Sequence, residues 1–346
     1  MRAPAAGSRI PPLTLASTMP RILLAPMEGL ADPLMRQILT TIGGYDWGIC
    51  EFIRVTESVL PNRTFLRTCP ELTQGSRTAA GTPIRVQLLG SEPHFLAANA
   101  RRLLRHRPAG VDINFGCPAP TVFRHRGGSA LLGEPELLHA IVAAVRAEVP
   151  RDIPFTAKMR LGIHDHSLAI DCARAIEAGG ADELIIHGRT KVDGYKPPAR
   201  WHLIDEVRQA VRLPVIANGE VWTVEDFRQC QQASGCADIM LGRGALADPL
   251  LARRVRGELP PESAANAALW PLLVPALADF WFGVRVRVLP VHAGGRLKQW
   301  LMLLRRHYPV AESLYQRLRP VKEAEVIDHL LLEAGILPHL PTELHP

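Results

Sequence analysis

The sequence lacks several features that would assign it to other classes of protein. Its 346 residues contain no run of about 18 apolar residues, so no segment is expected to span a membrane. The first 18 residues include Arg2 and Arg9 but no apolar core, which argues against a secretory signal. There is no low-complexity tract, and 47% of the residues are hydrophobic and 21% charged, which is the composition of a globular protein.

The cysteines show no metal-binding pattern. None of the six is spaced as CxxC, and none stands at zinc-ligand spacing from a histidine. His164 and His166 lack a third ligand, so a loop is favoured over a metal site there. The sequence therefore predicts no metal. Five of the cysteines are interpreted as packing or surface residues of a cytoplasmic protein, whose thiols stay reduced.

Alternating segments predict a barrel. Short β-branched or apolar runs alternate with longer amphipathic stretches, as in βαβ units. The predicted strands are Ile22–Ala25, Trp47–Phe52, Ile84–Leu88, Val111–Phe115, Phe155–Met159, Glu183–His187, Val215–Asn218 and Asp238–Leu241. Eight strand-then-helix repeats favour an α/β fold of the (β/α)8 TIM-barrel type. An open doubly wound sheet is the alternative, but no GxGxxG follows the first strand.

The pattern of predicted secondary structure changes after Gly257. The stretch Leu259–Ser263 is typical of a linker, and helical patterns without strand signals follow it, including Leu269–Phe282, Leu297–Arg306 and Val326–Glu333. We therefore predict three parts: a flexible extension or misassigned start at 1–18, a catalytic barrel at 19–258, and a small helical domain at 259–346.

Positive charge is concentrated in the helical part. The net charge of the chain is +6, but residues 285–322 contain nine Arg or Lys and one Glu, a net +8, which leaves −2 for the rest. Such a patch indicates an anionic partner such as nucleic acid. A merely solvated charged face is the alternative interpretation.

One cysteine stands apart from the others. In Asp112-Ile113-Asn114-Phe115-Gly116-Cys117-Pro118, a buried strand is ended by Gly116 and Pro118, and Cys117 lies on the turn between them. A cysteine on a turn after a strand is placed for chemistry more often than for packing.

The other predicted strands also end in polar or glycine residues, at the face where barrel enzymes place their active sites. The Gly242-Arg243-Gly244 and Asn218-Gly219-Glu220 segments suit a phosphate group. Gln87, Lys158 and His187 can donate hydrogen bonds to a flat heterocycle. Together these residues predict a flavin mononucleotide (FMN) pocket.

The motifs LLAPMEG, EFIRV, VQLLG, DINFGCP, AKMRLG, IHGRT, VIANGE and IMLGRGAL occur in this order along the chain. In these motifs the chain resembles bacterial tRNA-dihydrouridine synthases over roughly Met19 to Arg319. EFIRV and Arg296-Leu297-Lys298-Gln299-Trp300 are similar to the subfamily that modifies uridine 16 of the D-loop.

The resemblance implies an FMN enzyme that reduces the C5=C6 bond of a uridine in tRNA, with NADPH (or NADH) as reductant and Cys117 as the proton donor to C5. It implies flavin contacts from Pro26, Met27, Glu28, Gln87, Lys158, His187, Asn218, Gly219, Glu220, Gly242 and Arg243. It implies uridine or nearby RNA contacts from Arg54, Asn114, Arg160 and Tyr195, and contacts with the tRNA body from Arg296, Lys298 and Arg319. No membrane association and no obligate protein partner is expected.

Two other functions remain open on the residues alone. An FMN-dependent barrel oxidoreductase for a free small molecule accounts for the pocket but not for the basic segment. A non-enzymatic RNA-binding module accounts for the basic segment but leaves Cys117, Lys158 and His187 without a role.

Overall fold

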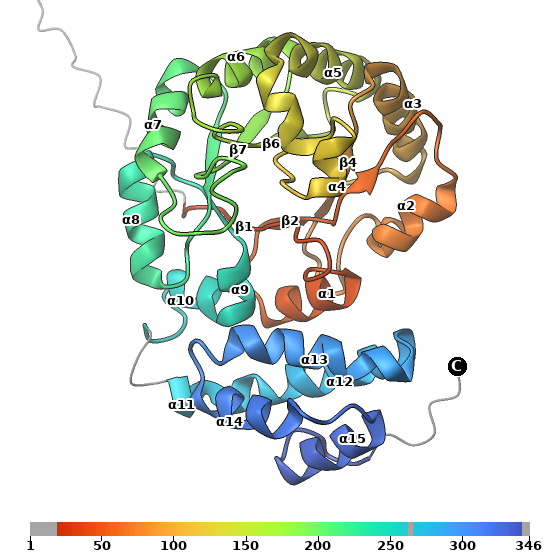
Figure 1. The fold of residues 1–346 in the computed structure, drawn as a ribbon, viewed down its shortest axis with the longest axis vertical. Helices are drawn as coiled ribbons and strands as arrows, with labels where there is room; N and C mark the ends of the chain where they lie inside the picture. Colours follow the sequence, from red (N-terminus) through yellow and green to blue (C-terminus); the bar gives the residue numbers. More distant parts are fainter. Residues whose placement is uncertain (1–18, 262–265, 341–346) are drawn as a thin grey trace, which may run out of the picture.

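Parallel strands close into a barrel at the centre of the structure (Figure 1). The computed structural model describes residues 19–261 and 266–340; the predicted extension, 1–18, lies outside the described residues. The strands in the described part are β1 (Ile22–Leu24), β2 (Trp47–Ile49), β3 (Ile53–Arg54), β4 (Ile84–Leu89), β5 (Val111–Phe115), β6 (Phe155–Arg160), β7 (Glu183–His187), β8 (Val215–Asn218) and β9 (Ile239–Leu241). Because β1 pairs with both β2 and β9, and β2 pairs onward with β4, the sheet closes on itself.

The short strands β2 and β3 together occupy one barrel position. β2 pairs with the start of β4 and β3 with its end, so the predicted strand Trp47–Phe52 is interrupted at residues 50–52. At this interruption Glu51 turns its carboxylate to the Gly29 N–H, which donates a hydrogen bond of 2.6 Å. Counted this way the barrel has eight positions, and the predicted (β/α)8 fold is confirmed.

Helices surround the barrel (Figure 1). Those of the barrel part are α1 (Pro33–Ile42), α2 (Asn62–Thr68), α3 (Pro93–Leu103), α4 (Pro120–Arg124), α5 (Pro135–Glu148), α6 (Ala169–Gly179), α7 (Trp201–Ala210), α8 (Val224–Ser234), α9 (Arg243–Ala247) and α10 (Leu251–Val255). Asp248 and Pro249 separate the short helices α9 and α10.

Strand alternation sorts the side chains into two sets. On β5 the outward residues Val111, Ile113 and Phe115 are fully buried under the helices, while Asp112 and Asn114 point into the barrel. Burying an apolar side chain of this size contributes roughly 1.5–3 kcal/mol. The outer layer therefore stabilises the fold, and the interior remains available for polar residues.

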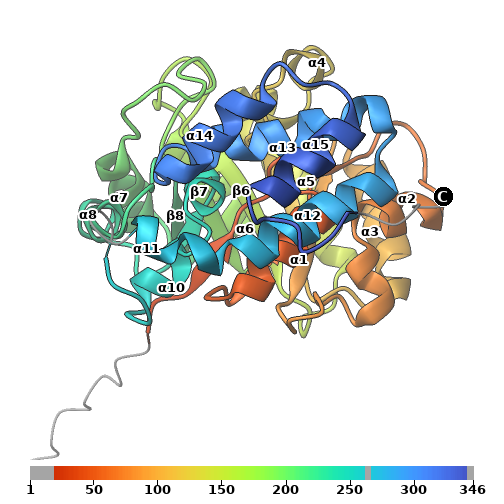
Figure 2. The ribbon, with the colours of Figure 1, turned by 90° about the horizontal axis from the view of Figure 1, so that it is seen from below.

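A layer of helices lies against one side of the barrel, shown below it in Figure 1 and in front of it in Figure 2. It consists of α11 (Asn266–Leu269), α12 (Val274–Arg287), α13 (Pro290–Leu304), α14 (Pro309–Leu318) and α15 (Ala324–Glu333). α12 packs on α1 and α13 on α9, where the Trp300 indole donates a hydrogen bond to the Leu246 carbonyl. Because these contacts are buried, the helical layer and the barrel form a continuous core.

No single helix in residues 19–261 and 266–340 is long and apolar enough to cross a membrane. Within these described ranges, one pair of segments, Asn266–Leu272 and Val274–Arg287, reaches that length and composition together, with a bend of 51° between them.

Candidate active site

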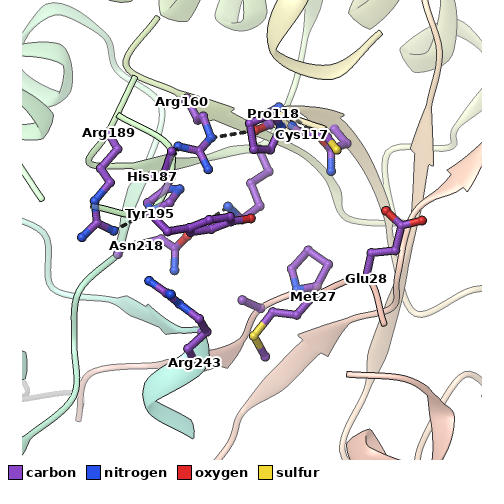
Figure 3. A pocket seen from close by; sticks show the side chains of 18 of the residues that line it. Met27, Glu28, Cys117, Pro118, Arg160, His187, Arg189, Tyr195, Asn218 and Arg243 are labelled. Carbon is purple, nitrogen blue, oxygen red and sulfur yellow. Dashed lines mark hydrogen bonds between the residues drawn. The ribbon is translucent and has the colours of Figure 1, made fainter. Parts of the chain in front are cut away.

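A pocket of about 590 Å³ opens at the carboxyl ends of the barrel strands (Figure 3). Of the residues predicted for the site, it is lined by Pro26, Met27, Glu28, Gln87, Asn114, Cys117, Lys158, Arg160, His187, Tyr195, Asn218, Gly219, Glu220, Gly242 and Arg243. The carboxyl ends of parallel barrel strands meet at one face, which is why residues scattered over the sequence converge there.

Four predicted residues lie elsewhere. Arg54 lines a smaller neighbouring pocket of about 310 Å³, close enough to Cys117 to act on its thiol electrostatically. Arg296 lies at the contact between the helical layer and the barrel, where it pairs with Asp32 at 2.6 Å and donates to the Gly29 carbonyl. Lys298 donates to a backbone carbonyl of the helical layer, and Arg319 is exposed at the end of α14. Their predicted contacts with RNA stay predictions.

The turn that carries Cys117 is tightly held. The Asn114 side-chain oxygen accepts hydrogen bonds from the backbone N–H groups of Gly116 (2.9 Å) and Cys117 (2.8 Å). The Arg160 guanidinium donates to the Gly116 carbonyl at 2.8 Å. Gly128 has φ +57°, and its backbone lies so close to the turn that a Cβ on Gly128 would be 2.8 Å from the Cys117 carbonyl oxygen. These contacts fix the position of the sulfur within the pocket.

Burial raises the pKa of the Cys117 thiol above its ordinary value, and the negative charge of Glu28 adds to the rise. A backbone hydrogen bond from Ala119 and the cations Arg160 and Arg54 oppose the shift only in part. At neutral pH the side chain is therefore a thiol that holds its proton, as a general acid requires, and not an activated thiolate.

A buried hydrogen-bond relay lies beneath the turn. The carboxylate of Asp112 accepts from Thr156 at 2.5 Å and from the Gln87 amide nitrogen at 2.6 Å. The Gln87 oxygen in turn accepts from the Asn114 amide nitrogen at 2.7 Å. An ionised carboxylate only accepts hydrogen bonds, so Asp112 fixes the orientation of both amides. Through them it presents an acceptor oxygen to the backbone of the Cys117 turn.

The charge state of Asp112 supports this relay. Burial raises the pKa of its carboxyl to about 6, while hydrogen bonds from Thr156 and Gln87 and the positive charge of Lys158 oppose the rise. At pH 7 the ionised form therefore predominates.

Lys158, which is half-buried, and His187, which is buried, differ in charge. Burial, with Arg160 adding repulsion, lowers the pKa of Lys158 to about 8, so at pH 7 the ammonium group is mostly charged. It donates to the Asn218 side-chain oxygen at 3.0 Å. Burial and the cations Arg160 and Lys158 lower the pKa of His187 well below its ordinary value, so its imidazole is neutral. Lys158 thus brings a cation and His187 a neutral ring to the pocket, a pair suited to an uncharged or anionic heterocycle.

Two tryptophans contribute to the site. Trp222 lines the pocket. Trp201 donates from its indole to the Gly219 carbonyl at 2.8 Å. Gly219 has φ +115°, and a Cβ there would lie 2.6 Å from the His187 ring, so only glycine fits this turn.

Sequence reasoning also missed Arg189. It lines the pocket with 1% of its surface exposed and pairs with Glu220. Burial, together with the cations Arg243 and Arg160, lowers its pKa to about 10. It stands two residues after His187, so the same strand-end pattern that selected His187 pointed to it as well.

Carboxylates neutralise part of the basic segment 285–322. The paired arginines are Arg285 with Glu325 and Asp328, Arg296 with Asp32, Arg305 with Glu312, and Arg317 with Glu333. Because most of these carboxylates lie outside the segment, its net charge of +8 overstates the charge that is free to meet a partner.

Comparisons with known proteins agree on a family. A family model described as "Dihydrouridine synthase (Dus)" matches residues 23–271. A protein of Ralstonia nicotianae named tRNA-dihydrouridine(16) synthase is 51% identical over 92% of this chain and 98% of the relative. Proteins with the same name from Aquipseudomonas alcaligenes and Pseudomonas syringae pv. tomato are 52% and 50% identical, each over 90% of this chain and 98% of the relative.

Solved structures support the fold. A 2-naphthoyl-CoA reductase complex superposes with a TM-score of 0.54 at 13% identity, covering 69% of this chain and 50% of that chain. A variant of NCR from Zymomonas mobilis gives a TM-score of 0.51 at 16% identity, covering 70% of this chain and 88% of that chain. At these identities the likeness concerns the barrel alone.

Proposed function

This chain belongs to the dihydrouridine synthase family, and on that premise we propose that it reduces the C5=C6 bond of uridine 16 in the D-loop of tRNA to 5,6-dihydrouridine. The observation that carries the proposal is Cys117, a half-buried thiol with a raised pKa, held on a hydrogen-bonded turn in a pocket for a flat heterocycle. The enzyme uses FMN with NADPH or NADH as reductant. We infer that it works in the cytoplasm, where all six cysteines remain free thiols.

The residues of the pocket fit FMN. Its volume lies within the usual range for cofactor sites. Lys158 has donor capacity left beside its one hydrogen bond to Asn218, and Gln87 keeps a second amide N–H beside the one that Asp112 accepts. The flavin-binding residues proposed are Pro26, Met27, Glu28, Gln87, Lys158, His187, Asn218, Gly219, Glu220, Gly242 and Arg243, with Arg189 added from the structure.

The mechanism divides between cofactor and chain. When bound and reduced by NADPH or NADH, FMN would supply the hydride for C6 of the uracil. Cys117 holds the proton at Sγ and donates it to C5, and the resulting thiolate is stabilised by the nearby cations Arg160 and Arg54. Asn114 and Arg160 hold the cysteine turn, and we propose that Tyr195 and Arg160 face the uridine.

The uracil must leave its place in the folded tRNA to reach this pocket. Splaying out a base costs a few kcal/mol, which phosphate contacts elsewhere on the protein can offset. We propose that the helical layer supplies such contacts through Lys298 and Arg319. Arg296, which bridges Asp32 and the Gly29 carbonyl, is better placed to hold the loop after β1, next to the predicted flavin contacts Met27 and Glu28.

Purified protein tests the proposal directly. It is expected to be yellow, and to oxidise NADPH when unmodified tRNA is added but not when free uridine or uracil is added. If the protein is instead a barrel oxidoreductase for small molecules, NADPH oxidation is expected to increase with a free small molecule and to be unaffected by tRNA. A protein that cannot be loaded with FMN excludes both.

Asp112→Asn tests the buried relay. The new amide can donate as well as accept, so Gln87 is no longer forced into one orientation and Asn114 loses its fixed acceptor. We expect a stability loss of about 1–3 kcal/mol. We also expect uridine reduction to fall about 10- to 100-fold because the Cys117 turn loosens. The rate at which NADPH reduces bound FMN is the internal control. If both half-reactions fall equally, the relay acts on the cofactor and not on the cysteine turn.

A further inference from the structure

Cations and aromatic rings alternate from the catalytic pocket to the helical layer. The guanidinium carbon of Arg160 lies 5.2 Å from the centre of the Tyr195 ring, and that of Arg243 lies 4.8 Å from the same ring. Arg243 also lies 5.2 Å from the Trp222 ring, on which Arg306 of the helical layer sits at 4.1 Å. Figure 3 shows the inner part of this series, with Tyr195 between Arg160 and Arg243. We call these five residues the cation–aromatic ladder.

No carboxylate in the described part of the chain neutralises the arginines of the ladder. In residues 19–261 and 266–340, Arg160, Arg243 and Arg306 form no salt bridge. Arg160 donates hydrogen bonds to the backbone carbonyls of Gly116, Thr190 and Gly194. Aromatic faces thus hold three like charges in place without neutralising them. Arg305, the neighbour of Arg306, shows the usual alternative, a salt bridge to Glu312.

Such an arrangement needs an anionic ligand. Burial lowers the pKa of Arg243, and the positive charge of Arg306 adds to that effect, so the two cations repel each other as they stand. A guanidinium already fixed on a ring loses little freedom when a phosphate binds. Arg243 belongs to the predicted flavin site, so FMN accounts for its positive charge. FMN does not account for the charge of Arg306, which is held on the outer face of Trp222.

We propose that Trp222 and Arg306 form a phosphate-binding site for the RNA strand next to the target nucleotide. The inference rests on the proposed function, which makes a splayed RNA strand the anion that enters this pocket. Arg306 is exposed on the helical layer, and Arg160, at the other end of the ladder, holds the catalytic turn. A strand that follows the ladder therefore runs between the cysteine and the basic helical layer, with Trp222 holding the Arg306 guanidinium toward it.

Arg306→Ala and Trp222→Leu test this site in the FMN-loaded protein, with an unmodified tRNA transcript as the probe. Arg306→Ala is expected to raise the KM for tRNA about ten-fold. It is also expected to reduce the slope of the logarithm of the tRNA binding constant against the logarithm of salt concentration by about 1, which corresponds to the loss of one phosphate contact. Trp222→Leu is expected to act in the same direction, and the double variant to be no worse than Arg306→Ala. Arg306 is exposed, so its substitution leaves the core intact even if Trp222→Leu disturbs the loop.

The matched control is Arg228→Ala, an equal change of charge at an exposed position on α8. It is expected to leave the KM for tRNA within about two-fold of the wild type. Equal effects of Arg306→Ala and Arg228→Ala overturn the inference, as does a loss of FMN from Arg306→Ala, which assigns the residue to the cofactor. If the wild type itself forms no dihydrouridine, the proposed function fails first, and that result is distinguishable from either outcome.

Discussion

Replacing Cys117 by alanine is expected to lower dihydrouridine formation about 100- to 10,000-fold while FMN stays bound, because the variant loses the proton donor and little else. The turn keeps its hydrogen bonds, since Asn114, Ser129 and Arg160 contact the backbone of the turn and not the sulfur. Single-turnover measurement of uridine reduction by pre-reduced enzyme isolates the affected step. Reduction of bound FMN by NADPH, measured on the same sample, is the control and is expected to change little.

The pH dependence of the same step distinguishes a proton donor from a nucleophile. Because burial raises the Cys117 pKa, the competent thiol is fully present at neutral pH and is lost only as pH rises through that raised value. Uridine reduction by the wild type is therefore expected to be level near neutrality and to fall in alkaline solution. A rate that increases with pH above neutrality, where Asp112 is already ionised, indicates an attacking thiolate instead and contradicts the assignment of Cys117 as an acid.

Asp248→Ala is expected to lower the free energy of unfolding by about 3–5 kcal/mol, because it leaves a buried arginine without its partner. Asp248 pairs with Arg254 at 2.8 Å, and both side chains are completely buried. The carboxylate also accepts from the Tyr308 hydroxyl, and Arg254 donates to Asn266 at 2.7 Å. Tyr308 and Asn266 belong to the helical part, so this cluster connects it to the barrel.

Urea unfolding of the FMN-loaded protein, followed by tryptophan fluorescence, measures the effect. Trp270 packs beside Tyr308 and reports on the cluster. The double variant Asp248→Leu/Arg254→Met is expected to recover part of the lost stability, because it removes both charges together. A loss below about 1 kcal/mol in Asp248→Ala contradicts the role given to the pair. The KM for tRNA is expected to rise in the single variant as the helical layer loosens.

The barrel and most of the pocket were predictable because each depends on local sequence. Strand β5 ends where Gly116 and Pro118 end it, and its predicted bounds are confirmed. Since the carboxyl ends of all barrel strands meet at one face, a list of strand-end residues is already a list of pocket residues. The same rule would have selected Arg189, which follows the end of β7 by two residues.

The relay and the ladder depend on tertiary structure, which a single sequence does not reveal. Asp112 meets Gln87 and Thr156 because neighbouring strands pair in one register, placing Asp112 opposite both. Trp222 and Arg306 meet only because α13 docks on the barrel. The net charge of residues 285–322 overstates the free positive charge because some of its partners are distant in sequence. Arg296, for example, pairs with Asp32 of the barrel.

Mapping dihydrouridine in tRNA by mass spectrometry tests the central claim most directly. The comparison is between a strain that lacks this protein, the same strain complemented with the wild-type protein, and the same strain complemented with Cys117→Ala. The proposed function predicts that dihydrouridine disappears at position 16 alone, returns with the wild type and does not return with the variant. Loss at position 17 or 20, or an unchanged position 16, contradicts it.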